Sequence, residues 1–97
     1  MTEIPRLSPV EAEILQLLIV HREMYGLELV AASEVIKRGT VYVTLGRMAE
    51  KGFVESREVK LEHEPGLPRR VFQATGHGER VLRAWQAAQA ILREALA

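Results

Sequence analysis

Basic side chains are concentrated in the middle of this 97-residue chain, among threonine and tyrosine hydroxyl groups. Residues 36–75 carry eight basic and five acidic groups, a net charge of +3, whereas residues 1–35 carry two basic and six acidic groups, a net charge of −4. Guanidinium, ammonium and hydroxyl groups hydrogen-bond to phosphate oxygens and to the edges of bases. The whole chain has no net charge, so it does not resemble a sequence-blind polyanion binder, but one face of it could touch DNA.

The residue types that common catalytic and metal sites need are absent or scattered. The sequence has no cysteine, aspartate or asparagine, which excludes disulfides, cysteine-based zinc sites, aspartate-rich calcium loops and a triad with aspartate. The three histidines, His21, His63 and His77, lack the spacing of metal ligands. No nucleophile–base pair, phosphate loop or carboxylate pair is visible. We therefore expect no enzyme, no metal site and no cofactor.

Length and composition indicate one compact unit. A chain of 97 residues lies below the size at which chains usually split into domains, and 47% hydrophobic residues can build a modest core. No apolar run approaches the roughly 18 residues of a membrane span, and no signal peptide opens the sequence. We expect a soluble, cytoplasmic protein.

Helical patterns fill the first half of the chain. Ser8-Pro9-Val10-Glu11 fits a capping box and predicts a helix over about residues 9–22. The apolar face predicted for this helix consists of Val10, Ile14, Leu17, Leu18 and His21. A short helix is expected after the break at Gly26, with core residues Leu27, Val30 and Ala31.

A third helix is expected to begin near Arg38 or Thr40 and to end at Gly52. Its buried stripe is predicted to be Val41, Leu45 and Met48, at spacings of four and three residues.

Two extended segments and a last helix complete the pattern. Residues 53–61 and 70–74 are predicted to form an antiparallel hairpin, with a turn around Pro65-Gly66. Thr75 is expected to cap a helix that runs to the end of the chain. The apolar stripe of this helix contains Val81, Trp85, Ala88, Leu92 and Ala95, whose spacing is that of a short helix–helix seam.

This order of elements predicts a mainly α fold with a small β-hairpin, a winged helix-turn-helix followed by a long C-terminal helix. The winged helix-turn-helix is assigned to residues 1–75 and a dimerisation helix to residues 76–97. In such a fold the second helix of the helix-turn-helix enters the major groove of DNA, and the hairpin, or wing, lies beside it.

Four segments in register resemble the PadR family of bacterial transcriptional regulators. They are YGLELV (25–30), RGTVYVTLGRMAEKGFV (38–54), GLPRRVFQAT (66–75) and TGHGERVL (75–82). The sequence departs from the family in a shorter stretch between the second and third helices, and in Lys37-Arg38, where Ser-Pro often opens the recognition helix. A single C-terminal helix is similar to the short form of the family, without a large effector domain.

The resemblance implies that Thr40, Tyr42, Thr44 and Arg47 occupy recognition-helix positions. Lys37 and Arg38 stand at the start of this helix, where backbone N–H groups also favour phosphate, and Arg69-Arg70 stand on the wing. Competing interpretations are packing for Tyr42, an ion pair of Arg47 with Glu50 or Glu11, and a solvated strand edge for Arg69-Arg70. Lys51 is interpreted as a charge at the helix C-terminus, and Arg57 and Lys60 as part of a solvated sheet surface.

The resemblance further implies a homodimer on a pseudo-palindromic operator in double-stranded DNA, with repression as the expected sign of regulation. The expected dimer residues are Leu82, Trp85, Ala88, Ile91 and Leu92. Some relatives bind flat aromatic compounds between tryptophans, so a small aromatic effector near Trp85 is a further hypothesis. The alternative function is a winged-helix module that binds proteins and no longer binds DNA.

Overall fold

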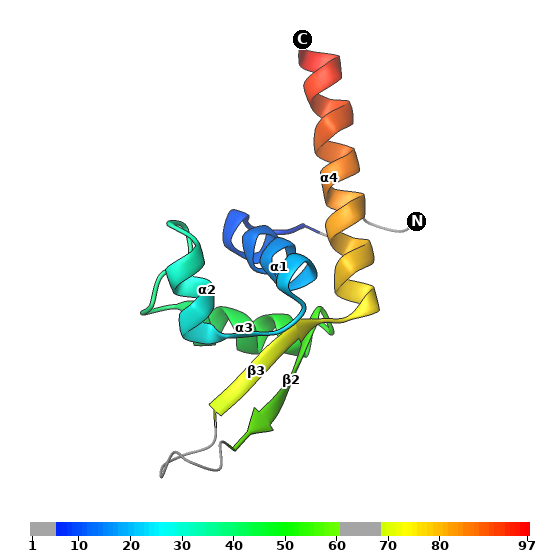
Figure 1. Ribbon diagram of the computed structural model, residues 1–97. Helices are drawn as coiled ribbons and strands as arrows, with labels where there is room; N and C mark the ends of the chain where they lie inside the picture. Colours follow the sequence, from blue (N-terminus) through cyan, green and yellow to red (C-terminus); the bar gives the residue numbers. More distant parts are fainter. Residues whose placement is uncertain (1–5, 61–68) are drawn as a thin grey trace.

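The computed structural model describes residues 6–60 and 69–97, which form four helices around a small sheet (Figure 1). The helices are α1 (Pro9–His21), α2 (Gly26–Ala32), α3 (Val41–Glu50) and α4 (Gly76–Leu96). The strands are β1 (Met24–Tyr25), β2 (Val54–Val59) and β3 (Arg69–Ala74). This is the predicted winged helix-turn-helix with a long C-terminal helix, and the described part of the chain contains no helix with the length and apolar character of a membrane span.

The capping box of α1 is formed as predicted. The Ser8 N–H donates to Glu11 Oε1 over 2.9 Å, and the Glu11 N–H donates to Ser8 Oγ over 3.1 Å. Pro9 occupies the first turn, where the N–H that it lacks has no helical partner to lose. Ser8, Pro9 and Glu11 therefore fix the start of α1 by local interactions alone.

The buried face of α1 differs from the prediction at its end. Ile14, Leu15 and Leu18 are buried, whereas His21 is exposed and lies outside the apolar face. His21 instead belongs to a tight turn in which the Glu23 N–H donates to the His21 carbonyl over 2.9 Å. Arg22, at the centre of this γ-turn, has φ 70° and ψ −58°, a strained conformation for a residue with a Cβ. The turn leads the chain directly from α1 into β1.

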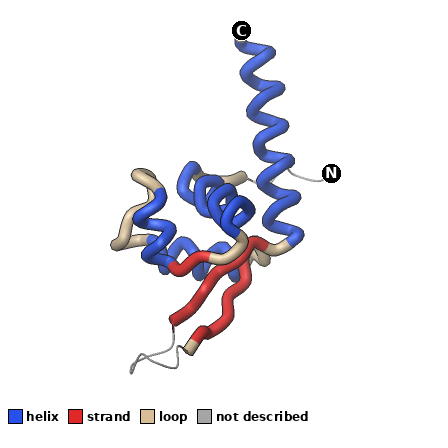
Figure 2. The backbone as a smooth tube through the Cα atoms, in the orientation of Figure 1, coloured by secondary structure: helices blue, strands red, loops and turns tan. Residues whose placement is uncertain are grey.

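The sheet has three strands in the order β1-β3-β2, all antiparallel (Figure 2). Val54 pairs with Ala74 and Val59 with Arg69, so β2 and β3 form the predicted hairpin. The third strand, β1, was not predicted, because two residues are too few to show an alternating pattern. The turn expected around Pro65-Gly66 lies outside the described residues.

The core lies between α1, α2, α3, the first turns of α4 and one face of the sheet. The predicted stripe of α3, Val41, Leu45 and Met48, is fully buried. The short helix α2 is present as predicted, and Val30 packs against the core, but Leu27 and Ala31 are exposed and the fully buried side chain is Leu29. A seven-residue helix gives too short a pattern for its buried face to be read from spacing.

The start of α4 is held against the beginning of the wing. Thr75 Oγ1 accepts a hydrogen bond from the Gly78 N–H over 2.9 Å and donates one to the Gly52 carbonyl over 2.5 Å. A Cβ at position 78 would collide with the backbone of Phe53, so glycine is required there for this approach. The C-terminal half of α4 extends away from the rest of the molecule (Figure 1).

Candidate nucleic-acid interface

The side of α3 that faces away from the core is the centre of the candidate site. With about 3.6 residues per turn, the face opposite the buried stripe carries Val43, Gly46, Arg47 and Glu50, all of them exposed. Tyr42 lies on one flank and is 55% exposed. Thr40 is exposed just before the helix, and Thr44 is partly buried on the other flank. The hydroxyl-bearing residues therefore border an outward face that combines the apolar Val43 and Gly46 with the charged Arg47 and Glu50.

Two exposed arginines of this region have no partner in the described residues. The side chains of Arg38 and Arg47 form no ion pair or hydrogen bond with any residue in the ranges 6–60 and 69–97. Their guanidinium groups keep all of their donors available for a bound anion. Lys37, by contrast, donates from Nζ to the Glu34 carbonyl over 2.5 Å.

Glu11, one of the partners considered for Arg47, is bound by Lys51 instead. Lys51 Nζ lies 3.0 Å from Glu11 Oε2 and joins the end of α3 to the start of α1. Burial raises the pKa of Glu11, but the Ser8 N–H and the Lys51 ammonium oppose it and bring the pKa below its ordinary value. Lys51 is therefore a structural charge at the C-terminus of α3, in agreement with the prediction.

Tyr42 is both packed and exposed. A Cβ at Gly26 would lie 2.6 Å from Tyr42 Cε1, which shows that the tyrosine ring rests on the backbone at the start of α2. Packing of Tyr42 was the competing interpretation, and the structure shows that packing leaves more than half of the side chain open to a partner. The Gly26–Tyr42 contact thus sets the position of an exposed phenol beside α3.

The two wing arginines meet Tyr42 at a hollow of about 310 Å³ between α2, α3 and β3. The lining residues are Tyr25, Leu27, Glu28, Tyr42, Arg69 and Arg70. Both arginines are engaged within the protein. Arg69 stacks over the Tyr25 ring at 5.7 Å, and Arg70 donates to Ser56 Oγ over 3.0 Å and to Glu58 Oε1 over 3.2 Å.

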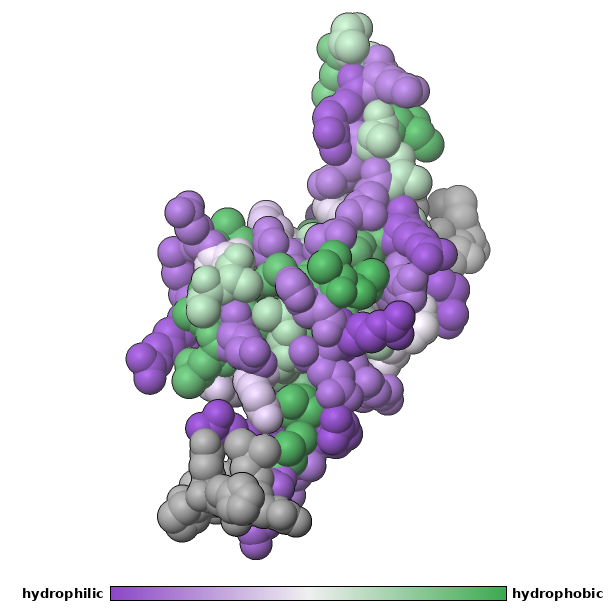
Figure 3. Space-filling model, in the orientation of Figure 1, coloured by the Kyte–Doolittle hydropathy of each residue, from purple (hydrophilic) through white to green (hydrophobic). Residues whose placement is uncertain are grey.

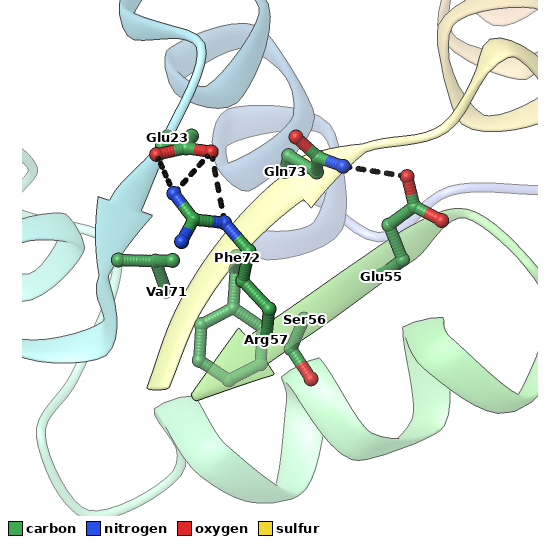
Figure 4. A pocket seen from close by; sticks show the side chains of 7 residues that line it. All are labelled: Glu23, Glu55, Ser56, Arg57, Val71, Phe72 and Gln73. Atoms are coloured by element: carbon green, nitrogen blue, oxygen red, sulfur yellow. Dashed lines mark hydrogen bonds and ion pairs between the residues drawn. The ribbon is translucent and has the colours of Figure 1, made fainter. Parts of the chain in front are cut away.

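The outer face of the sheet carries polar side chains that bind one another (Figure 4). Arg57 Nη2 contacts both carboxylate oxygens of Glu23, at 2.9 and 2.8 Å. Gln73 Nε2 donates to Glu55 Oε1 over 2.6 Å on the same surface. Arg57 therefore lies on a solvated sheet surface, as predicted, and its guanidinium is bound by a carboxylate.

The residues predicted for a dimer interface divide between the core and the exposed part of α4. Leu82 is 3% exposed and belongs to the core of its own chain, so it has no surface to offer a partner. Trp85 and Ala88 are half-buried, whereas Ile91, Leu92 and Leu96 are exposed on the projecting end of α4. Figure 3 shows hydrophobic side chains on this projecting end.

No metal site is apparent in the part of the chain that the structure describes, since no three histidine or glutamate side chains gather there. His63 lies outside the described residues. Val43 and Gly46 lie on the outward face of α3 but were not among the predicted DNA-binding residues. Val43 is predicted by the sequence to face away from the core, and the position of Gly46 opposite the buried stripe in a helical projection was the available signal.

Comparison with solved structures identifies the fold. A PadR family transcription regulator from Clostridium difficile R20291 matches with a TM-score of 0.69 and 24% identity, over 93% of this chain and 100% of that one. A PadR-like transcription factor from Bacteroides fragilis matches with a TM-score of 0.76 and 25% identity, over 90% and 85%. Bacillus subtilis PadR in complex with operator DNA matches with a TM-score of 0.68 and 20% identity, over 84% of this chain and 48% of that one.

The sequence itself identifies the family. No curated protein gives a significant match to the chain. The model of the transcriptional regulator PadR-like family matches residues 14–84, which span all of the elements from α1 into α4. This match covers most of the chain and includes the residues of the candidate site on α3 and the wing. The chain therefore belongs to the PadR-like family of transcriptional regulators.

Proposed function

We propose that this regulator binds double-stranded DNA sequence-specifically, with α3 in the major groove. The observation that carries the proposal is the exposed Arg47, which has no partner among the described residues, on the outward face of the second helix of a helix-turn-helix. The structural similarity to Bacillus subtilis PadR, which was solved with operator DNA, supports the same mode of binding.

Each α3 residue has a role that its chemistry allows. Arg47 donates to a guanine edge or a phosphate, and the hydroxyls of Thr40 and Thr44 reach base edges. Lys37 and Arg38 bind phosphates at the start of the helix, and the exposed Tyr42 hydroxyl does so at its flank.

The wing supplies a second group of phosphate contacts. Arg69 and Arg70 border the same hollow as Tyr42, so a DNA strand that passes Tyr42 comes within reach of both guanidinium groups. Arg70 must exchange its Glu58 partner for a phosphate, which lowers the net gain from this contact.

The proposed assembly is a homodimer formed through α4. Trp85, Ala88, Ile91 and Leu92 lie on one side of α4, and two of them are exposed although they are large and apolar. Pairing of two α4 helices places two copies of α3 in successive major grooves, about 34 Å apart, on a pseudo-palindromic operator. A dimer bound near a promoter blocks polymerase, so we propose repression.

Fluorescence anisotropy tests DNA binding. The protein is titrated with DNA from the region upstream of its own gene and with unrelated DNA of equal length, at several salt concentrations. We expect tighter binding to the upstream DNA, with a steep salt dependence, and we expect Arg47→Ala to bind this DNA more weakly. Equal binding to both DNAs would contradict specificity at that region. No binding to either, at low salt, would favour the alternative module that docks proteins.

Sedimentation of an α4 variant tests the dimer. Leu92→Glu places a charge in the proposed interface, and Ala90→Glu places the same charge on the opposite side of α4. We expect Leu92→Glu to be monomeric and to bind DNA weakly, and Ala90→Glu to behave as the wild type. Dimers in both variants would place the interface elsewhere. A promoter–reporter fusion gives the sign of regulation, since transcription falls with a repressor and rises with an activator.

The single tryptophan of the chain gives a direct assay for an aromatic effector. Trp85 is half-buried on α4 within the proposed interface, so a flat compound bound beside it would quench its fluorescence. Planar aromatic compounds that neither quench Trp85 nor change DNA affinity would exclude this site from effector binding.

A further inference from the structure

Gly46 occupies a position where the fold does not require glycine. It lies in the middle of α3, it is exposed, and a Cβ added there would meet nothing within 4 Å. Its φ lies outside the left-handed region, so an L side chain would not strain the backbone. Glycine weakens a helix interior relative to alanine, because it loses more backbone entropy on folding. The isolated protein therefore gains nothing from glycine at this position.

Val43 is also unfavourable for the isolated protein. It is 57% exposed and β-branched, a type that is less suited to helices than most polar residues at exposed positions. It has no hydrogen-bonding group in its side chain. Residues three apart are neighbours on a helix surface, so Val43 and Gly46 form one apolar strip on the outward face of α3.

The surroundings of this strip favour DNA over an apolar partner. Arg47 is adjacent in sequence and Arg38 stands just before the helix, and neither side chain has a partner among the described residues. Glu50, one turn beyond Gly46, is also charged and exposed. An apolar partner would leave these charges close to a surface that cannot solvate them. In the major groove, the apolar group presented by a base pair is the 5-methyl of thymine.

We propose that Val43 and Gly46 are specificity-determining residues that read a thymine by its methyl group. Val43 packs against the 5-methyl, and Gly46 lets the base edges approach the helix backbone more closely than any side chain would allow. Arg47 then holds the adjacent base or phosphate. This inference rests on the proposed function, because it requires α3 to lie in the major groove.

The first test couples removal of the methyl group to removal of the valine. A duplex is selected by the protein from a random-sequence pool, and each thymine in turn is replaced with deoxyuridine, which lacks only the 5-methyl. We expect one thymine in each half-site at which the wild type loses about fourfold in affinity, the value for one buried methyl group. Val43→Ala should lose nothing further at this position. Val20→Ala, an exposed valine on α1, is the matched control and should keep the full loss.

The second test separates folding from binding at Gly46. Gly46→Ala should raise the Tm by about 2–8 °C and should lower affinity for the selected duplex at least tenfold. A stabilised variant with weaker binding cannot be explained by misfolding.

The outcomes distinguish this inference from the function on which it rests. A wild-type protein that enriches no sequence and binds no duplex would overturn the proposed function and this inference with it. A protein that binds its selected duplex, while deoxyuridine costs Val43→Ala as much as the wild type, would overturn the thymine contact alone. Wild-type affinity in Gly46→Ala would overturn the close approach.

Discussion

The outward face of α3 and the β2–β3 wing both carry arginines, but the two regions hold them differently. Arg47 on α3 has no partner in the described residues, whereas Arg57 and Arg70 on the wing are bound by Glu23 and Glu58. The strand register is one cause of this difference, because Glu58 lies directly opposite Arg70. Equal formal charge therefore does not give equal availability for an external anion.

The difference has an energetic consequence for binding. An exposed ion pair contributes about 0–1 kcal/mol to stability, so the wing pairs do little to hold the fold together. Each of them nevertheless places a carboxylate beside a guanidinium that would otherwise bind phosphate. We therefore expect α3 to supply most of the binding free energy and the wing to adjust it.

The largest effect is expected for Arg47→Ala. Loss of a bidentate or phosphate contact should reduce operator affinity by about 5- to 150-fold, or about 1–3 kcal/mol. The melting temperature should change little, because the Arg47 side chain is exposed and forms no ion pair or hydrogen bond with the described residues. Anisotropy titrations at several salt concentrations measure both the affinity and the number of phosphates contacted. A salt slope that falls by about 1 would assign Arg47 to a phosphate, and an unchanged slope would assign it to a base.

The second prediction concerns the stability of the fold, through the ion pair between Glu11 and Lys51, the residue that follows α3. Glu11→Gln removes the ion pair with Lys51 and weakens the capping box, so we expect a loss of about 1–2 kcal/mol at neutral pH. Lys51 should not become a DNA contact as a result. Urea unfolding followed by circular dichroism gives the free energy of unfolding, and Glu50→Gln, an exposed residue beside Lys51, is the control.

The loss of stability in Glu11→Gln should depend on pH, in a direction that follows from the pKa of Glu11. The pKa of Glu11 is lower in the folded chain than its ordinary value of 4.5, so its stabilisation is complete above pH 4.5 and is lost as pH falls through the folded-state pKa. The difference in stability between the wild type and Glu11→Gln should therefore shrink in acid. A difference that stays constant from pH 7 to pH 3 would refute the ionic contribution.

A smaller effect is expected at the wing, and in the opposite direction. Glu58→Gln should tighten DNA binding by about two- to threefold, because it releases Arg70 and removes a negative charge near the phosphates. Arg70→Ala should weaken binding by a similar factor. The gain from Glu58→Gln should be reduced in the Arg70→Ala background, and a fully retained gain would show that Glu58 does not act through Arg70.

The smallest effect is expected on the outer face of the sheet. Arg57→Ala should change both the free energy of unfolding and DNA affinity by less than about 0.5 kcal/mol, because the Arg57–Glu23 pair is exposed and its charges already compensate each other. A loss comparable to that of Arg47→Ala would erase the proposed difference between the two regions and place DNA on the outer face of the wing.

Much of the fold follows from local features of the sequence. The capping box at Ser8 and Glu11, the buried stripe of α3 and the cap at Thr75 were each predicted and each is present. The short helix after Gly26 was predicted and is present, but its buried face was predicted incorrectly in part and β1 was not predicted, because seven and two residues give no reliable period. Long amphipathic segments with caps could therefore be predicted from the sequence, whereas the buried faces of short elements depend on the neighbours that they pack against.

The sequence by itself determined the family and the order of the main elements, and it indicated most residues of the candidate interface, because these depend on spacing and on local hydrogen bonds. Only the tertiary structure decided which of those residues are exposed and free of a partner among the described residues, and so able to contact DNA or a second copy of the chain. It placed Leu82 in the core, bound Lys51 to Glu11 and Arg70 to Glu58, and seated Tyr42 on Gly26. These contacts join residues far apart along the chain, and their formation depends on how helices and strands pack, which residue spacing does not encode.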